Sequence, residues 1–201
     1  LEIVLAFAFQ SLYGYIYGKL GLVVGIFMLG LVVGAPSGRF VAAKSRHSVW
    51  LAGFVILLLL AGISAVLPAF TSLSAAAAAA GSGQTMIETG IYALVAFVGW
   101  AVGTQFQLAN RLYADAGGEI GAGAAMTDAA DHAGASVGAL ATGVLLIPVF
   151  GLAPACVILA SVNCAGLLFL SAAIITMPGH GETHAVVESV PDNPVHNEED
   201  V

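Results

Sequence analysis

The chain has 201 residues, of which 59% are hydrophobic and 8% are charged, and its formal net charge is -7 at pH 7. Soluble domains carry about 25% charged residues, so this composition excludes an ordinary soluble protein. A basic surface for nucleic acid is also excluded, because the chain has only five Lys and Arg residues. Residues 48–84 and 133–181 contain no Asp, Glu, Lys or Arg. Each run exceeds the roughly 20 apolar residues that cross a bilayer, which predicts an integral membrane protein.

The apolar runs predict six membrane-spanning helices. Their approximate bounds are Ile3 to Tyr17, Leu20 to Gly38, Val49 to Pro68, Thr85 to Leu108, Met126 to Ile147 and Leu152 to Met177. Runs of about 20 residues differ from the roughly 10-residue alternating segments of a membrane β-barrel. The fold class is therefore an all-α, polytopic membrane helical bundle.

Prolines and one alanine run are expected to mark the ends of these spans. Proline lacks an amide N–H and clashes with the preceding helical turn, so it favours helix ends. The prolines at such positions are Pro36, Pro68, Pro148, Pro154 and Pro178. Residues 75–80 are all alanine and precede Gly81-Ser82-Gly83, which indicates a connector with room for a short helical turn.

Polar side chains occur within several predicted spans. Gln10, Tyr13 and Tyr17 share one face of the first span. Gln105 lies in the fourth span and Asn163 in the sixth. Polar residues in a span face the bundle interior more often than the lipid. We expect these side chains either to form interhelical hydrogen bonds or to contact a solute.

Glycines recur every four residues in three of the predicted spans. They are Gly30, Gly34 and Gly38 in the second, Gly99 and Gly103 in the fourth, and Gly134 and Gly138 in the fifth. Small residues four apart form a flat strip that lets another helix backbone approach closely. We expect these strips to pack helices together, and a glycine-lined transport path is the alternative.

Basic residues indicate the orientation of the chain. Four of them follow the second or the fourth span, namely Arg39, Lys44, Arg46 and Arg111, whereas the opposite side holds only Lys19. Cytoplasmic loops carry an excess of Lys and Arg, so the four basic residues form a cytoplasmic anchor. The sequence therefore predicts a multi-pass protein of the inner, or plasma, membrane with both termini in the cytoplasm.

The fifth predicted span opens with a polar cluster of Asp128, Asp131 and His132, which share a helix face. Acids are favourable in the first turn of a helix, so the cluster could simply lie at the cytoplasmic surface. The alternative is a polar group that faces a cavity and handles protons or a cation.

Residues 179–201 differ from the rest of the chain. Six of the twelve acids follow Met177, together with Pro191 and Pro194 and without Lys or Arg. We expect a six-helix transmembrane domain over residues 1–178 and a disordered acidic cytoplasmic tail over residues 179–201. Ligand spacing supports neither a metal site nor a cofactor site. The chain begins without Met and directly in an apolar run, so we expect its natural start to lie upstream.

Three stretches resemble a known family. They are Phe9-Gln10-x-Leu12-Tyr13-Gly14-Tyr15-x-Tyr17, Phe27-Met28-Leu29-Gly30-Leu31-x-x-Gly34, and the stretch from Asp131 to Gly151 that includes Gly134, Gly138, Gly143 and Pro148. Together they resemble the membrane region of spermidine-synthase-like integral membrane proteins, which have a major-facilitator-like helical domain. The resemblance implies that these helices are the second half of a longer transporter-like bundle or a shortened relative. The aminopropyltransferase domain of that family has no counterpart after Met177, so its enzymatic activity is not expected here.

Two functions fit the sequence. The first is a transporter-like bundle that moves or senses a small polar or cationic solute. The second is a membrane scaffold that packs against a partner protein or enzyme complex. The expected partners are the lipid bilayer and either an upstream helical half or other membrane subunits. Convergence of Gln10, Asp131 and Asn163 on one cavity would favour transport, and their dispersal would favour a scaffold.

Overall fold

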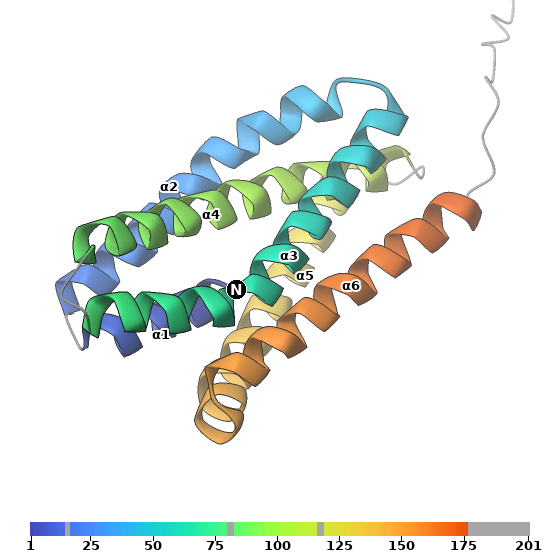
Figure 1. Cartoon of the computed structure of the whole chain (residues 1–201). Coiled ribbons are helices and arrows are strands. Elements are labelled where there is room, and N and C mark those ends of the chain that lie inside the picture. Colours follow the sequence, from blue (N-terminus) through green and yellow to red (C-terminus); the bar gives the residue numbers. More distant parts are fainter. Residues whose placement is uncertain (15–16, 80–82, 116–118, 177–201) are drawn as a thin grey trace, which may run out of the picture.

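The computed structural model describes residues 1–14, 17–79, 83–115 and 119–176, and these residues form helices with no strand (Figure 1). The helices are α1 (Glu2–Tyr13), α2 (Tyr17–Ala42), α3 (Arg46–Ala79), α4 (Gln84–Asp115), α5 (Ile120–Leu140), the π-helix η1 (Ala141–Phe150) and α6 (Leu152–Thr176). The predicted all-α class is confirmed. The predicted acidic tail lies outside the described residues.

Within the described residues, five helical segments are long and apolar enough to cross a membrane. They are Gly18–Ala42, Arg46–Ala77, Gln84–Asp115, Gly121–Phe150 and Leu152–Ile175. The fourth of these is a continuous helical segment that comprises α5 and η1. Large apolar side chains such as Phe169 and Ile175 are 79% and 83% exposed, which suits a lipid environment. The chain therefore has the character of a multi-pass membrane protein.

The first predicted span is shorter in the structure than the sequence suggested. α1 has 12 residues, or about 18 Å at a rise of about 1.5 Å per residue, against a hydrocarbon core of roughly 30 Å. It ends because Gly14 adopts a φ of 77°, a conformation that glycine reaches without strain. The described residues thus contain five helices of crossing length and a short apolar helix, where the sequence predicted six crossings.

Three prolines that were expected at helix ends lie inside helices instead. Pro36 is within α2, Pro68 within α3 and Pro148 within η1. Membrane helices tolerate proline, because neighbouring groups and local π geometry satisfy the freed backbone groups. α3 changes direction along its length (Figure 1), and it continues past Pro68 to Ala79. Residues 75–79 of the alanine run therefore belong to the end of α3 and do not form a separate connector.

α2 and α4 lie backbone to backbone along a strip of glycines. A Cβ built at Gly30 would lie 2.5 Å from the Ala96 carbonyl oxygen, and one at Gly38 would lie 2.7 Å from the Thr104 carbonyl oxygen. Real Cβ atoms do not come so close, so only glycine fits. The glycines of this contact are Gly30, Gly34 and Gly38 on α2 and Gly99 and Gly103 on α4. Successive α2 positions meet successive α4 positions, so the two helices run parallel.

α3 and α6 run antiparallel beside this pair. A Cβ at Gly53 would lie 3.7 Å from Leu170, and one at Gly166 would lie 3.8 Å from Leu57. The start of α3 therefore faces the end of α6. Together with the parallel α2 and α4, this brings four residues to one end of the bundle, which we call the basic end: Arg39, Lys44, Arg46 and Arg111. Lys19 lies at the opposite end.

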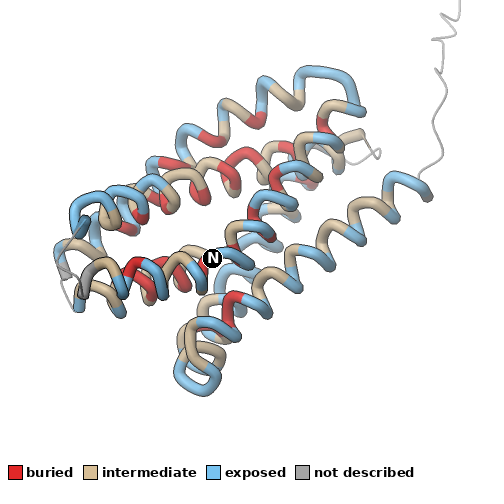
Figure 2. Tube along the Cα trace, in the orientation of Figure 1, coloured by how far each residue is buried: buried red, intermediate tan, exposed pale blue. Residues whose placement is uncertain are grey.

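Burial is concentrated in the first four helices (Figure 2). The largest fully buried side chains are Phe9 and Leu5 of α1 and Ile91 of α4. By contrast, α5 and η1 bury few residues, and α6 buries Ala155 and Cys156 near its start. The well-packed part of the bundle thus has α5, η1 and α6 on one side of it. α6 contacts α3 there, and a space remains among the helices.

Candidate functional site

That space is a cavity of about 510 Å³, which we call the central cavity. Every helical segment contributes to its lining, and most lining residues are apolar. The polar lining residues are Glu2 of α1, Gln105 of α4, Asp131 of α5, Thr142 of η1 and Asn163 of α6. The cavity therefore gathers two carboxylates, two amides and one hydroxyl from five segments of the chain.

Small residues of α5 explain why the cavity exists. Gly134, Ala135, Gly138 and Ala139 line it on one helix face, and none of them has a side chain that could fill the space. Among the described residues, no heavy atom lies within 4 Å of a Cβ built at Gly134 or Gly138. The prediction that these two glycines pack against another helix is therefore wrong, because in the structure they face open space. The same spacing packs α2 because α4 presents glycines to it, whereas the described part of the chain presents no such strip to α5.

Gln105 and Asp131 stand between the central cavity and a smaller one. The second cavity, of about 270 Å³, lies between α4 and α5 and shares Val102, Gln105 and Asp131 with the first. Both polar side chains can therefore contact a solute on either side of them. Asp131 is therefore a carboxylate that lines both cavities.

The chemistry of the central cavity favours a cation or a hydrogen-bond donor. Among the described residues that line it, none is Lys, Arg or His. The Asn163 amide nitrogen donates a hydrogen bond to the Leu159 carbonyl oxygen at 3.0 Å, which leaves the Oδ1 atom as the acceptor of that side chain. Ionisable groups inside a membrane bundle typically mark ion or substrate pathways.

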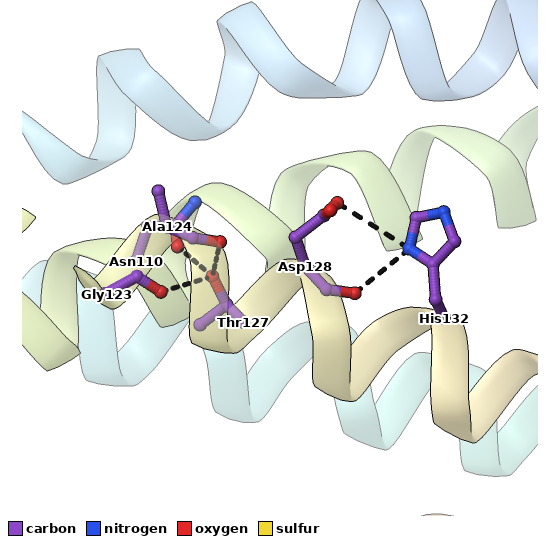
Figure 3. A network of polar contacts seen from close by, with 6 residues as sticks. All are labelled: Asn110, Gly123, Ala124, Thr127, Asp128 and His132. Carbon is purple, nitrogen blue, oxygen red and sulfur yellow. Dashed lines mark hydrogen bonds and ion pairs between the residues drawn. The ribbon is translucent and has the colours of Figure 1, made fainter. Parts of the chain in front are cut away.

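Asp128 and His132 are separated from Asp131 in the structure. The His132 Nδ1 atom lies 3.6 Å from the Asp128 carboxylate and 3.0 Å from the Asp128 carbonyl oxygen (Figure 3). The Asp128 side chain is 63% exposed and the His132 side chain is 76% exposed, on the outside of the bundle. α5 begins at Ile120, so Asp128 and Asp131 lie beyond its first turn. The interpretation of these acids as first-turn residues is thereby corrected.

A polar contact holds α5 to α4 beside that pair. The Thr127 hydroxyl contacts the Asn110 side-chain oxygen of α4, and it also lies 2.9 Å from the Gly123 carbonyl oxygen (Figure 3). At the same level, Tyr113 of α4 packs against Gly123. These contacts fix the start of α5 against α4 at the basic end, four to eight residues before Asp131.

Gln10 and Tyr13 belong to a different part of the molecule. As far as the described residues show, neither lines the central cavity. The Tyr13 hydroxyl donates a hydrogen bond to the Gln84 carbonyl oxygen at 2.9 Å, which joins α1 to the start of α4. Gln10 accepts the Gly14 amide through its backbone oxygen at 2.8 Å. The structure therefore brings together three predicted polar residues, Gln105, Asp131 and Asn163, and leaves these two apart.

An ion pair next to Tyr13 escaped the sequence analysis. The Lys19 Nζ atom lies 2.7 Å from the Glu88 carboxylate, and the Tyr92 hydroxyl donates to the same carboxylate at 2.8 Å. Lys19 also lies 5.3 Å from the centroid of the Tyr13 ring, within cation–π range. The pair could have been found, because Lys19 and Glu88 are opposite charges near the same end of the second and fourth spans.

At the basic end, Arg111 pairs with Asp115 one turn later, at 3.1 Å. Arg39 closes α2, Lys44 lies in the α2–α3 turn and Arg46 opens α3. No three His, Cys, Asp or Glu side chains of the described residues are grouped as metal ligands would be.

No protein-family model, curated protein or solved structure matches the chain. The central cavity is therefore the basis on which a function can be argued.

Proposed function

We propose that the chain is a transporter-like membrane protein whose central cavity binds a small cationic or polar solute. One observation carries the proposal: Gln105, Asp131 and Asn163, from three different helices, line the same cavity. Gln10, which was expected to join Asp131 and Asn163 there, is replaced by Gln105. Polar residues that served only to join helices would be spread over separate contacts. The described lining residues include two carboxylates and no Lys, Arg or His, which favours a cation over an anion.

The same proposal includes an orientation. Arg39, Lys44, Arg46 and Arg111 gather at one end, and short loops rich in Lys and Arg face the cytoplasm. We place that end, and with it the end of α6, on the cytoplasmic side of the inner membrane. The expected cytoplasmic N-terminus is not part of the proposal, because α1 has 12 residues and is too short to cross. The resemblance to spermidine-synthase-like membrane proteins belongs to the proposal as well, and with it an upstream helical half as a partner.

Asp131→Asn tests the proposed role of the cavity, because the amide keeps the shape of the side chain and removes its charge. The probes are radiolabelled methylammonium and rubidium, whose uptake is measured in proteoliposomes. We expect Asp131→Asn to abolish uptake and to leave the bundle folded. Asp128→Asn is the matched control, since it removes the same charge one helical turn away on the outside. Equal uptake by the parent and Asp131→Asn, or equal loss in both variants, would contradict the proposal.

A membrane scaffold is the second candidate, and the position of Asp128 and His132 favours it. Charged and polar pairs in apolar helices seldom face lipid, so protein contact on this side of α5 would suit them. The double variant Asp128→Leu/His132→Leu separates the two functions. A scaffold predicts that this variant dissociates from a larger complex in mild detergent, as measured by native mass. Transport alone predicts an unchanged mass.

A further inference from the structure

The outer face of α2 at the basic end carries a pocket that the proposed function does not use. It has a volume of about 280 Å³ and is lined by Pro36, Arg39 and Phe40. These residues lie on the helix face opposite Gly34 and Gly38, which pack on α4. The pocket therefore opens toward the surrounding bilayer. It combines a cation with an exposed aromatic ring, since Phe40 is 76% exposed.

An apolar stripe leads from this pocket along the same face of α2. Val33 and Leu29 follow Pro36 at the spacing of successive helical turns, and Leu29 and Val33 are exposed. From Arg39 to Leu29 the helix rises about 15 Å. One leaflet of a bilayer has a hydrocarbon depth of about 15 Å, which is half of the whole core. The stripe thus has the length of one acyl chain and begins at a guanidinium group.

We propose that this face of α2 binds one anionic phospholipid, with its phosphate on Arg39 and one acyl chain along Phe40, Pro36, Val33 and Leu29. The planar guanidinium group matches phosphate with two parallel hydrogen bonds. The lipid site shares no residue with the central cavity, so the proposed lipid binding can be tested separately from the proposed transport.

The charge of the neighbouring turn explains why the lipid is anionic. Between Glu2 and Glu88 the sequence has no acidic residue, whereas Arg39, Lys44 and Arg46 lie within eight positions of one another. The turn between α2 and α3 is therefore purely basic. A zwitterionic headgroup would bring its own positive charge into this field, and a headgroup with net negative charge would not.

Native mass spectrometry of the intact chain tests the proposal. The probes are palmitoyl-oleoyl phosphatidylglycerol and the phosphatidylcholine with the same acyl chains. We expect Arg39→Gln to weaken phosphatidylglycerol binding about fivefold, because one basic residue near an anionic surface has about that effect. Arg111→Gln is the matched control, since it removes the same charge at the same end from a residue that pairs with Asp115 at 3.1 Å. Equal weakening by both variants, or equal binding of the two lipids, would overturn the proposal.

Soluble glycerol 3-phosphate distinguishes a lipid from a free phosphate as the ligand. A tenfold excess of it over phosphatidylglycerol should leave the bound lipid in place, because it lacks the acyl chain that the stripe contacts. Displacement of the lipid would show a site for free phosphate and reject the lipid assignment. Arg39 is exposed, so its variant should fold normally, and size-exclusion chromatography checks this.

Discussion

The Thr104 hydroxyl of α4 donates a hydrogen bond to the Gly34 carbonyl oxygen of α2 at 3.2 Å, and the same hydroxyl lies 2.8 Å from the Trp100 carbonyl oxygen of its own helix. Thr104 is buried, and so is Gly34, where a side chain would meet the α4 backbone. The bond and the close approach depend on each other, because the hydroxyl reaches α2 only across a contact without side chains.

Thr104→Val should lower the free energy of unfolding modestly. Interhelical hydrogen bonds in membrane proteins contribute about 0.6 kcal/mol on average and at most about 1.7 kcal/mol. Unfolding in mixed detergent micelles, followed by circular dichroism, measures the loss. Thr104→Ser keeps the hydroxyl and is the control, and we expect it to lie closer to the parent. A Ser variant that loses as much as the Val variant would show that the methyl group, and not the hydrogen bond, matters.

Gly34→Ala and Gly138→Ala should change stability in opposite directions. At Gly34 the new methyl group overlaps the Trp100 carbonyl oxygen, and such overpacking costs about 1–3 kcal/mol. At Gly138 the methyl group enters open space, and replacing a mid-helix glycine by alanine stabilises by about 0.5–1 kcal/mol. The same detergent unfolding experiment compares them. Destabilisation by Gly138→Ala would indicate that α5 packs on another helix at this glycine.

Lys19 and Glu88 should be energetically coupled. A double-mutant cycle with Lys19→Met and Glu88→Gln isolates their interaction. The side chains are 33% and 24% exposed, and exposed pairs contribute about 0.2–1 kcal/mol, so we expect a coupling near the upper end of this range. Tyr92→Phe in the Lys19→Met background should destabilise further, because Glu88 then loses its remaining donor. A coupling energy of zero would mean that water stabilises the two separate charges as well as the ion pair does.

Thiol labelling tests the orientation. In a chain with Cys156 and Cys164 replaced by alanine, a single cysteine is placed at Ser45 or at Thr85. These positions lie at the basic end and at the opposite end of the bundle. In sealed cells, a reagent that cannot cross the membrane should label Thr85→Cys and should spare Ser45→Cys. Labelling of Ser45→Cys from outside would reverse the proposed orientation.

The sequence predicted the all-α membrane class and the glycine strip of α2, because both depend on local composition and spacing. It did not reveal that the partner of Gly30, Gly34 and Gly38 is α4, since the same spacing occurs at Gly134 and Gly138 without a partner. A glycine strip allows another helix backbone to approach closely. Which helix does so depends on the arrangement of all the helices.

The candidate site was predictable in part. Asp131, Gln105 and Asn163 were identified as polar residues in apolar helices, and the structure places all three on one cavity. Residues adjacent in sequence point in different directions on a helix, which is why Asp131 lines the cavity and His132 does not. Glu2 and Thr142 were missed, because near the start of α1 and within η1 neither stands out from its neighbours by spacing or pattern.

The direct contact between the α2 and α4 backbones has a mechanical consequence. Because the glycines let the two backbones touch and leave few side chains between them to change rotamer, we expect the two helices to move as one rigid unit. α5 and α6 bury far less of their length, and the cavity lies along them. The proposed transport therefore predicts that a motion which admits or releases a solute involves α5 and η1 more than the α2–α4 pair, with the turn at Gly151 as a hinge.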